Sequence, residues 1–177
     1  NKKGKATLQS SYIKNVVLGV YMPPSANVYY NGTTLKVEQT TFDFTTFKPN
    51  YTGQNTHGVK PECGVLLNDW IGTIGGTLPL QLNSFNNLNT GIVSIGSIII
   101  VKRSVFKNIN YDTFYSTAYI GTAITSIKSS SHTGKLTILP EAWSYTTVDS
   151  SYRGIYTNGS ELTATYIHLL NVRTGVE

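Results

Sequence analysis

Helical spacing is almost absent from this chain of 177 residues, and that absence is what most constrains its fold. No window of a dozen residues carries apolar side chains at positions i, i+3, i+4 and i+7 without interruption by glycine or β-branched runs. Short segments rich in Val, Ile, Thr, Tyr and Phe follow one another instead, separated by Gly, Asn and Pro. This pattern is typical of an all-β domain. We expect one antiparallel β-sandwich or jelly roll of about eight to ten strands.

Two Asn-Gly pairs predict hairpins. Asn31-Gly32 lies between extended segments in NVYYNGTTLKVE, and Asn158-Gly159 does so in RGIYTNGSELTATYIHLL. Asn and Gly tolerate positive φ at both central positions of a type I′ turn, whose twist matches that of two antiparallel strands. The sequence therefore predicts that the chain reverses direction at both pairs.

Further strands are predicted over residues 11–21, 40–47, 76–82, 92–103, 112–125 and 134–139. Gly96 indicates a bulge or a bend within the fourth of these segments. Pro79 restricts the third to the edge of a sheet, because proline cannot donate a backbone hydrogen bond. We find no internal repeat and no domain boundary, so residues 11–177 are expected to form the domain. Residues 1–10 are expected to be a basic arm or the end of a preceding segment.

The composition favours an extracellular or virion protein. Charged residues make up 13% of the chain, against roughly 25% in an average soluble protein, so Ser, Thr and Asn must solvate the surface. The net charge is +5, in part because of Lys2, Lys3 and Lys5, but no strip of basic and aromatic residues predicts nucleic-acid binding. Cys63 is the single cysteine, which excludes an intrachain disulfide and predicts an unreactive buried or loop thiol. No segment is long and apolar enough to span a membrane as a helix.

Motifs that carry chemistry are missing. The sequence has no nucleophile elbow, no phosphate-binding loop, and no Cys or His pairs at the spacing of metal ligands. Glycoside hydrolysis requires two carboxylates a few ångströms apart, and no spacing among the nine acidic residues establishes such a pair. We therefore expect a protein that is not an enzyme and that needs neither a metal nor a cofactor.

Aromatic residues next to polar ones predict a ligand site. The C–H faces of sugars stack on Trp and Tyr rings, while Asp, Asn and Arg bond to the hydroxyls. The chain has 12 tyrosines, more than one core accommodates, so several must be exposed. Two stretches combine both kinds of residue. The predicted ligand-binding residues are Asn68, Asp69 and Trp70 in the first, and Trp143, Tyr145, Asp149, Tyr152 and Arg153 in the second.

The C-terminal part, residues 134–170, resembles the final module of bacteriophage tail-fibre and baseplate receptor-binding proteins. The residues that carry the resemblance are KLTILP (135–140), the irregular aromatic stretch that follows, and the closing hairpin at Asn158-Gly159. The resemblance implies a trimeric β-sandwich head that recognises a saccharide of the host surface without catalysis. It assigns no individual binding residue.

These observations lead to a functional expectation with three alternatives. We expect a non-enzymatic receptor- or carbohydrate-binding head of a phage or viral fibre, a homotrimer located on the virion. The first alternative is a monomeric bacterial fimbrial or surface adhesin with the same sugar chemistry. The second is a virion-building jelly roll, in which exposed tyrosines form subunit contacts. The third is a carbohydrate-active enzyme.

Overall fold

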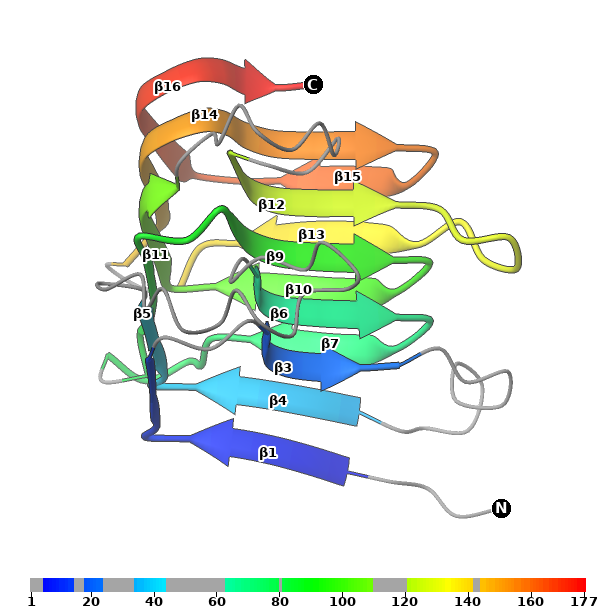
Figure 1. Ribbon diagram of the computed structural model, residues 1–177, viewed down its shortest axis with the longest axis horizontal. Coiled ribbons are helices and arrows are strands. Elements are labelled where there is room, and N and C mark those ends of the chain that lie inside the picture. The colour runs from blue at the N-terminus through cyan, green and yellow to red at the C-terminus, as the bar shows by residue number, and fades with distance from the viewer. Residues whose placement is uncertain are drawn as a thin grey trace, which may run out of the picture.

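The chain winds through successive turns that are stacked along one axis, with β1 at one end of the stack and β16 at the other (Figure 1). The computed structural model describes residues 5–14, 18–23, 34–43, 63–79, 81–109, 121–141 and 144–177. We call each turn a rung. The rungs, from first to sixth, are β1–β3, β4–β6, β7–β9, β10–β12, β13–β14 and β15–β16.

Corresponding strands of consecutive rungs pair to form three faces. The first face is a six-stranded sheet of β1 (Lys5–Gln9), β4 (Thr34–Glu38), β7 (Ile71–Ile74), β10 (Ile98–Lys102), β13 (Lys135–Leu139) and β15 (Glu161–Ala164). The second face contains β2 (Tyr12–Lys14), β5 (Thr41–Asp43), β8 (Asn83–Asn86), β11 (Ser104–Ile109) and the first halves of β14 (Thr146–Asn158) and β16 (Ile167–Val176). The third face contains β3 (Leu18–Met22), β6 (Cys63–Asn68), β9 (Thr90–Ile95), β12 (Thr122–Ile127) and the second halves of β14 and β16.

The prediction of an antiparallel sandwich or jelly roll is wrong. Each named strand of the described segments pairs in parallel with its equivalent in the next rung, in all three faces. The arrangement is that of a β-helix, in which each rung contacts only its neighbours. The chain therefore does contain a structural repeat. Its period is irregular, because Lys5 is in register with Thr34, 29 residues on, whereas Lys135 is in register with Glu161, 26 residues on.

Residues with positive φ redirect the chain at the corners between the faces. At the corner between the second and third faces these residues are Asn87, Asn108, Ser150 and Asn171, with φ of 57°, 54°, 60° and 52°. Asn and Asp adopt this left-handed conformation more readily than most residues, and glycine does so without strain. At the corner between the third and first faces the residues of positive φ are Asp69, Gly96, Gly134 and Gly159. A single left-handed residue turns the strand onto the next face without reversing it.

The predicted hairpin at Asn158-Gly159 is one of these corners. Gly159 has a φ of +67°, but Asn158 is not among the residues of positive φ, so the pair does not form a type I′ turn. β14 ends at Asn158, and β15 after the corner pairs in parallel with β13 rather than folding back on β14. The other predicted hairpin, Asn31-Gly32, lies outside the described residues.

The predicted strands are confirmed in part. The prediction for residues 134–139 matches β13, and the bend predicted at Gly96 separates β9 from β10. The segment 76–82 is not a strand in its described residues, and Pro79 lies in a turn before β8. Lys5–Gln9, inside the segment expected to be an arm, forms β1 and pairs with β4. Cys63 is buried in β6, as predicted, and its thiol donates to the carbonyl oxygen of Val65.

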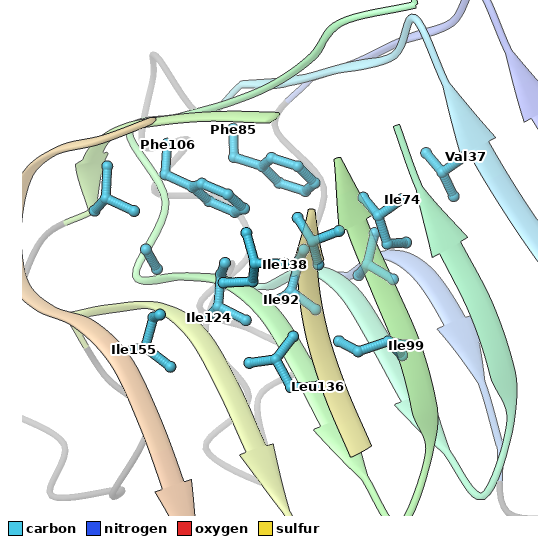
Figure 2. Packing of buried hydrophobic residues seen from close by; sticks show 14 of the residues in the cluster. Val37, Ile74, Phe85, Ile92, Ile99, Phe106, Ile124, Leu136, Ile138 and Ile155 are labelled. Atoms are coloured by element: carbon cyan, nitrogen blue, oxygen red, sulfur yellow. The ribbon is translucent and has the colours of Figure 1, made fainter. Parts of the chain in front are cut away.

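The interior is filled by columns of apolar side chains, one from each rung (Figure 2). On the second face the rings of Phe42, Phe85 and Phe106 are stacked, with centroids 4.8 and 4.6 Å apart and planes within about 10° of parallel. Val148 continues this column in the fifth rung and Leu169 in the sixth. The first face contributes Val37, Ile74, Val101 and Ile138, and the third contributes Val65, Ile92, Ile124 and Ile155.

Candidate functional site: the outer surface of the last two rungs

Strand β14 brings four of the predicted ligand-binding residues into one strip. Its 13 residues run from the second face to the third, past the left-handed corner at Ser150. Asp149 precedes that corner, Tyr152 and Arg153 follow it, and Tyr145 lies just before the strand. From Tyr145 to Tyr152 is seven residues, or at most about 25 Å of extended chain. Because the strand turns at Ser150, the strip crosses from the outer side of the second face to that of the third.

At the start of the strip, three rings form an exposed surface that we call the aromatic platform: Tyr145, Tyr166 and His168. The ring of Tyr145 lies 4.6 Å from that of His168 and 6.1 Å from that of Tyr166, measured between centroids. Tyr166 is 68% exposed and Tyr145 is 39% exposed. Tyr166 is held at a φ of +51°, immediately before β16. Exposed apolar ring surface of this kind is what stacking against a sugar requires.

In the middle of the strip, Asp149 is held by neighbours from both rungs. Its Oδ1 accepts hydrogen bonds from Asn171 Nδ2 at 2.9 Å and from Ser150 Oγ at 3.0 Å. The hydrogen bond from Asn171, then that from Ser150, and the charge of Lys107 lower the pKa of Asp149 below its ordinary value. The carboxylate consequently stays ionised over the whole neutral range.

Beyond the corner, two arginines stack on two tyrosines. We call this group, Tyr152, Arg153, Tyr156 and Arg173, the Arg–Tyr cluster. The guanidinium carbon of Arg153 lies 5.2 Å from the ring centroid of Tyr152 and 5.5 Å from that of Tyr156. The guanidinium carbon of Arg173 lies 5.0 Å from the ring centroid of Tyr152. Glu177 accepts a hydrogen bond from Arg153 Nε at 2.6 Å. The cluster thus fixes two cations around one ring.

The first predicted stretch lies elsewhere, at the corner between the second and third rungs. Asn68 ends β6, and Asp69 occupies the left-handed corner position with a φ of 60°. Trp70 follows, packs partly buried against the core, and donates from Nε1 to the carbonyl oxygen of Pro23 at 2.8 Å. The structure therefore does not join these three residues to the strip on β14. Trp143, the remaining predicted ligand residue, lies outside the described residues.

Asp69 supports the loop between β12 of the fourth rung and β13 of the fifth. Its Oδ1 accepts a hydrogen bond from Ser129 Oγ at 2.7 Å and lies 2.9 Å from His132 Nδ1. Ser129 Oγ in turn accepts from the backbone N–H groups of Ser131 and His132. The side chains of Asp69 and His132 are only 13% and 14% exposed. Although a serine, a histidine and an aspartate meet here, the serine hydroxyl is directed at the carboxylate, and the group stabilises the loop. A nucleophilic serine would instead donate to the histidine.

Five residues of the strip were not predicted: Tyr156, Tyr166, His168, Arg173 and Glu177. The sequence does contain a signal for some of them. Along β14 and β16 the register offset is constant at 21 residues, from Thr146 with Ile167 to Ile155 with Val176. The same offset relates Tyr145 to Tyr166 and Tyr152 to Arg173. A search for a 21-residue offset near the C-terminus would have brought these residues together.

Comparisons with known proteins add no assignment. No family model, no curated protein and no solved structure matches the chain. In the part of the chain that the structure describes, no helix has the length and apolar character needed to cross a membrane. Among the same residues, no three His, Cys, Asp or Glu side chains gather as they would around a metal ion.

Proposed function

We propose that this protein is a non-enzymatic carbohydrate-binding domain of a phage or viral attachment fibre, and that the strip on β14 and β16 is its binding surface. The observation that carries the proposal is the aromatic platform, in which Tyr145, Tyr166 and His168 from two rungs form one exposed surface. Tyr and His rings exposed to this extent contribute little to folding, whereas they provide stacking surface for a sugar.

The polar groups of the strip complement the platform. Asp149 supplies acceptors for hydroxyl groups, and the Arg–Tyr cluster supplies donors a few residues further along β14. Asp149 and the four residues of the Arg–Tyr cluster lie on β14 and β16, which pair along the second and third faces, rather than on long loops. A surface that is fixed in this way loses little conformational entropy when a ligand binds.

The surroundings of Asp149 and Glu177, the two carboxylates of the strip, favour binding over hydrolysis. A glycosidase needs one carboxylic acid whose pKa is raised, so that it donates a proton to the leaving oxygen. The pKa of Asp149 is lowered, in the opposite direction, and Glu177 is engaged by Arg153. We therefore propose attachment without cleavage, with weak contacts multiplied across a homotrimer.

A binding assay on the intact chain tests this proposal. Tyr145→Ala and Tyr166→Ala should each weaken binding to cell-surface polysaccharide by about two- to tenfold. Tyr21→Ala is the matched control, because Tyr21 is 50% exposed on the first rung and lies outside the strip. If the three variants bind equally well while keeping the circular dichroism of the parent, the platform is not the binding surface.

Light scattering tests the oligomeric part of the proposal. A mass three times that of the 19.4 kDa chain is expected for a fibre head. A monomer that binds saccharide would instead favour the surface adhesin. Release of reducing sugar by the purified protein would contradict the non-enzymatic assignment.

A further inference from the structure

The Arg–Tyr cluster is positively charged, and among the described residues one of its two guanidinium groups has no carboxylate partner. Of its two guanidinium groups, that of Arg153 bonds to Glu177. Arg173 is exposed, and among the described residues it contacts the ring of Tyr152 and has no carboxylate partner. The cluster thus carries two guanidinium charges, and the side-chain carboxylate of Glu177 bonds to one of them.

The position of Arg173 over the ring of Tyr152 favours binding of a planar anion. A guanidinium that lies over an aromatic ring uses its face for the ring and keeps its in-plane N–H groups at its edge. Those groups match the two coplanar oxygens of a carboxylate in a bidentate pair. The ring also limits the rotamers that the long side chain explores, so less entropy is lost on binding.

The charges along the strip give a ligand a preferred direction. Asp149 is ionised and lies on the platform side of the corner at Ser150, whereas Arg173 lies on the other side. A negative group near Asp149 would be repelled, although Lys107 offsets part of that charge. A ligand that carries one anionic group therefore places its neutral rings on the aromatic platform and its anion at the Arg–Tyr cluster.

We propose that the ligand is an acidic saccharide, and that the carboxylate of one of its sugar units binds Arg173. This inference rests on the proposed function, because it names the chemical class of the saccharide that the strip binds. The proposed site then has two parts, the aromatic platform for neutral sugar rings and the Arg–Tyr cluster for the carboxylate.

The experiment compares one polysaccharide in two chemical forms. Binding of the intact protein is measured to a polyuronate and to the same polymer after reduction of its carboxyl groups to alcohols. Arg173→Gln removes the cation, Arg173→Lys keeps the charge but removes the planar fork, and Lys14→Gln is the matched charge control on the exposed surface of the first rung. Dextran sulfate serves as a competitor, in order to separate carboxylate recognition from attraction to any polyanion.

We expect the polyuronate to bind about ten- to a hundredfold more tightly than its reduced form, because reduction removes the hydrogen-bonded charge pair between the carboxylate and Arg173. Arg173→Gln should lose most of that preference, Arg173→Lys should lose part of it, and Lys14→Gln should retain it. Tyr166→Ala should weaken the binding of both polymers.

Three results would overturn it. The reduced polymer binds as tightly as the polyuronate, or Arg173→Gln behaves as Lys14→Gln does, or dextran sulfate competes as well as the polyuronate. In the first two cases, a loss of neutral-polymer binding in Tyr166→Ala leaves the proposed function intact. If neither polymer binds and a survey of other glycans finds no ligand, the proposed function fails together with this inference.

Discussion

The ring of Phe106 occupies the space that a side chain on Gly91 would need. A Cβ added to Gly91 would lie 2.5 Å from Phe106 Cδ1 and 2.5 Å from the carbonyl oxygen of Ala123, both in the next rung. Gly64 stands in the same relation to Phe85, and Gly19 to Phe42. The stack of phenylalanines in the second face therefore depends on a column of glycines in the third.

Gly91→Ala should destabilise the protein severely. The methyl group meets a buried ring and a backbone carbonyl oxygen, and neither of these moves without disturbing a rung. We expect a loss of about 3 kcal/mol or more in the free energy of unfolding, at the upper end of overpacking costs. Urea unfolding followed by circular dichroism measures it. Gly175→Ala is the control, because its Cβ would meet only Leu169 Cδ1, at 3.2 Å, and should cost far less.

Ala123 holds the corresponding position in the fourth rung, where the next residue of the column is Val148 rather than phenylalanine. In the second and third rungs a glycine on the third face accompanies a phenylalanine in the next rung, whereas here the larger Ala123 accompanies the smaller Val148. Val148→Phe alone should therefore be destabilising, whereas Ala123→Gly with Val148→Phe should recover part of the loss. A double-mutant cycle should give a favourable coupling of about 1–3 kcal/mol. Additive effects would show that the two positions do not share this space.

Ser129→Ala should loosen the loop that Asp69 supports without affecting saccharide binding. The substitution removes a donor to Asp69 and the acceptor of two backbone N–H groups. We expect a loss of about 1–3 kcal/mol in stability, because these partially buried groups lose their partners. Ser130→Ala, at an exposed neighbouring position, is the control. If Ser129→Ala is fully folded and still binds saccharide more weakly than the parent, Asp69 and its neighbours belong to the ligand site.

Asn171→Ala should raise the pKa of Asp149, because the amide of Asn171 is the first of the causes that lower it. The folded state holds this pKa below the unfolded value of about 3.9. The associated stability is therefore present above about pH 4, and it is lost as the pH falls through the folded-state pKa. A carboxyl-carbon NMR titration of Asp149 in the parent and in Asn171→Ala measures the shift. Asn108→Ala is the control, since Asn108 bonds to Asn87 and not to Asp149. An unchanged Asp149 pKa in Asn171→Ala would contradict the assignment of the cause.

Four residues of the strip were chosen from the sequence, and all four come from one short stretch of the chain. Tyr145, Asp149, Tyr152 and Arg153 lie within nine residues, so they stay close together along the chain whichever fold it adopts. Their partners from β16 were missed, because nothing within that stretch shows which strand lies beside it. Asp69 was predicted as a ligand residue because it lies beside Asn68 and Trp70. The structure places it at a corner, where it contacts Ser129 and His132, apart from the strip on β14.

That the chain is built of strands follows from the sequence alone. The sequence also shows where several of these strands end. Alternating apolar residues, β-branched runs, and Gly or Asn at the turns are local properties, and β13 and the bend at Gly96 follow from them. Only the tertiary structure decided that the strands are parallel. A hairpin at Asn158-Gly159 needs positive φ at both residues, whereas a corner of the β-helix needs it at one. The same pair is therefore compatible with either fold. The choice is made by packing between rungs, where Phe42 stacks on Phe85, 43 residues away, against a glycine from the third face.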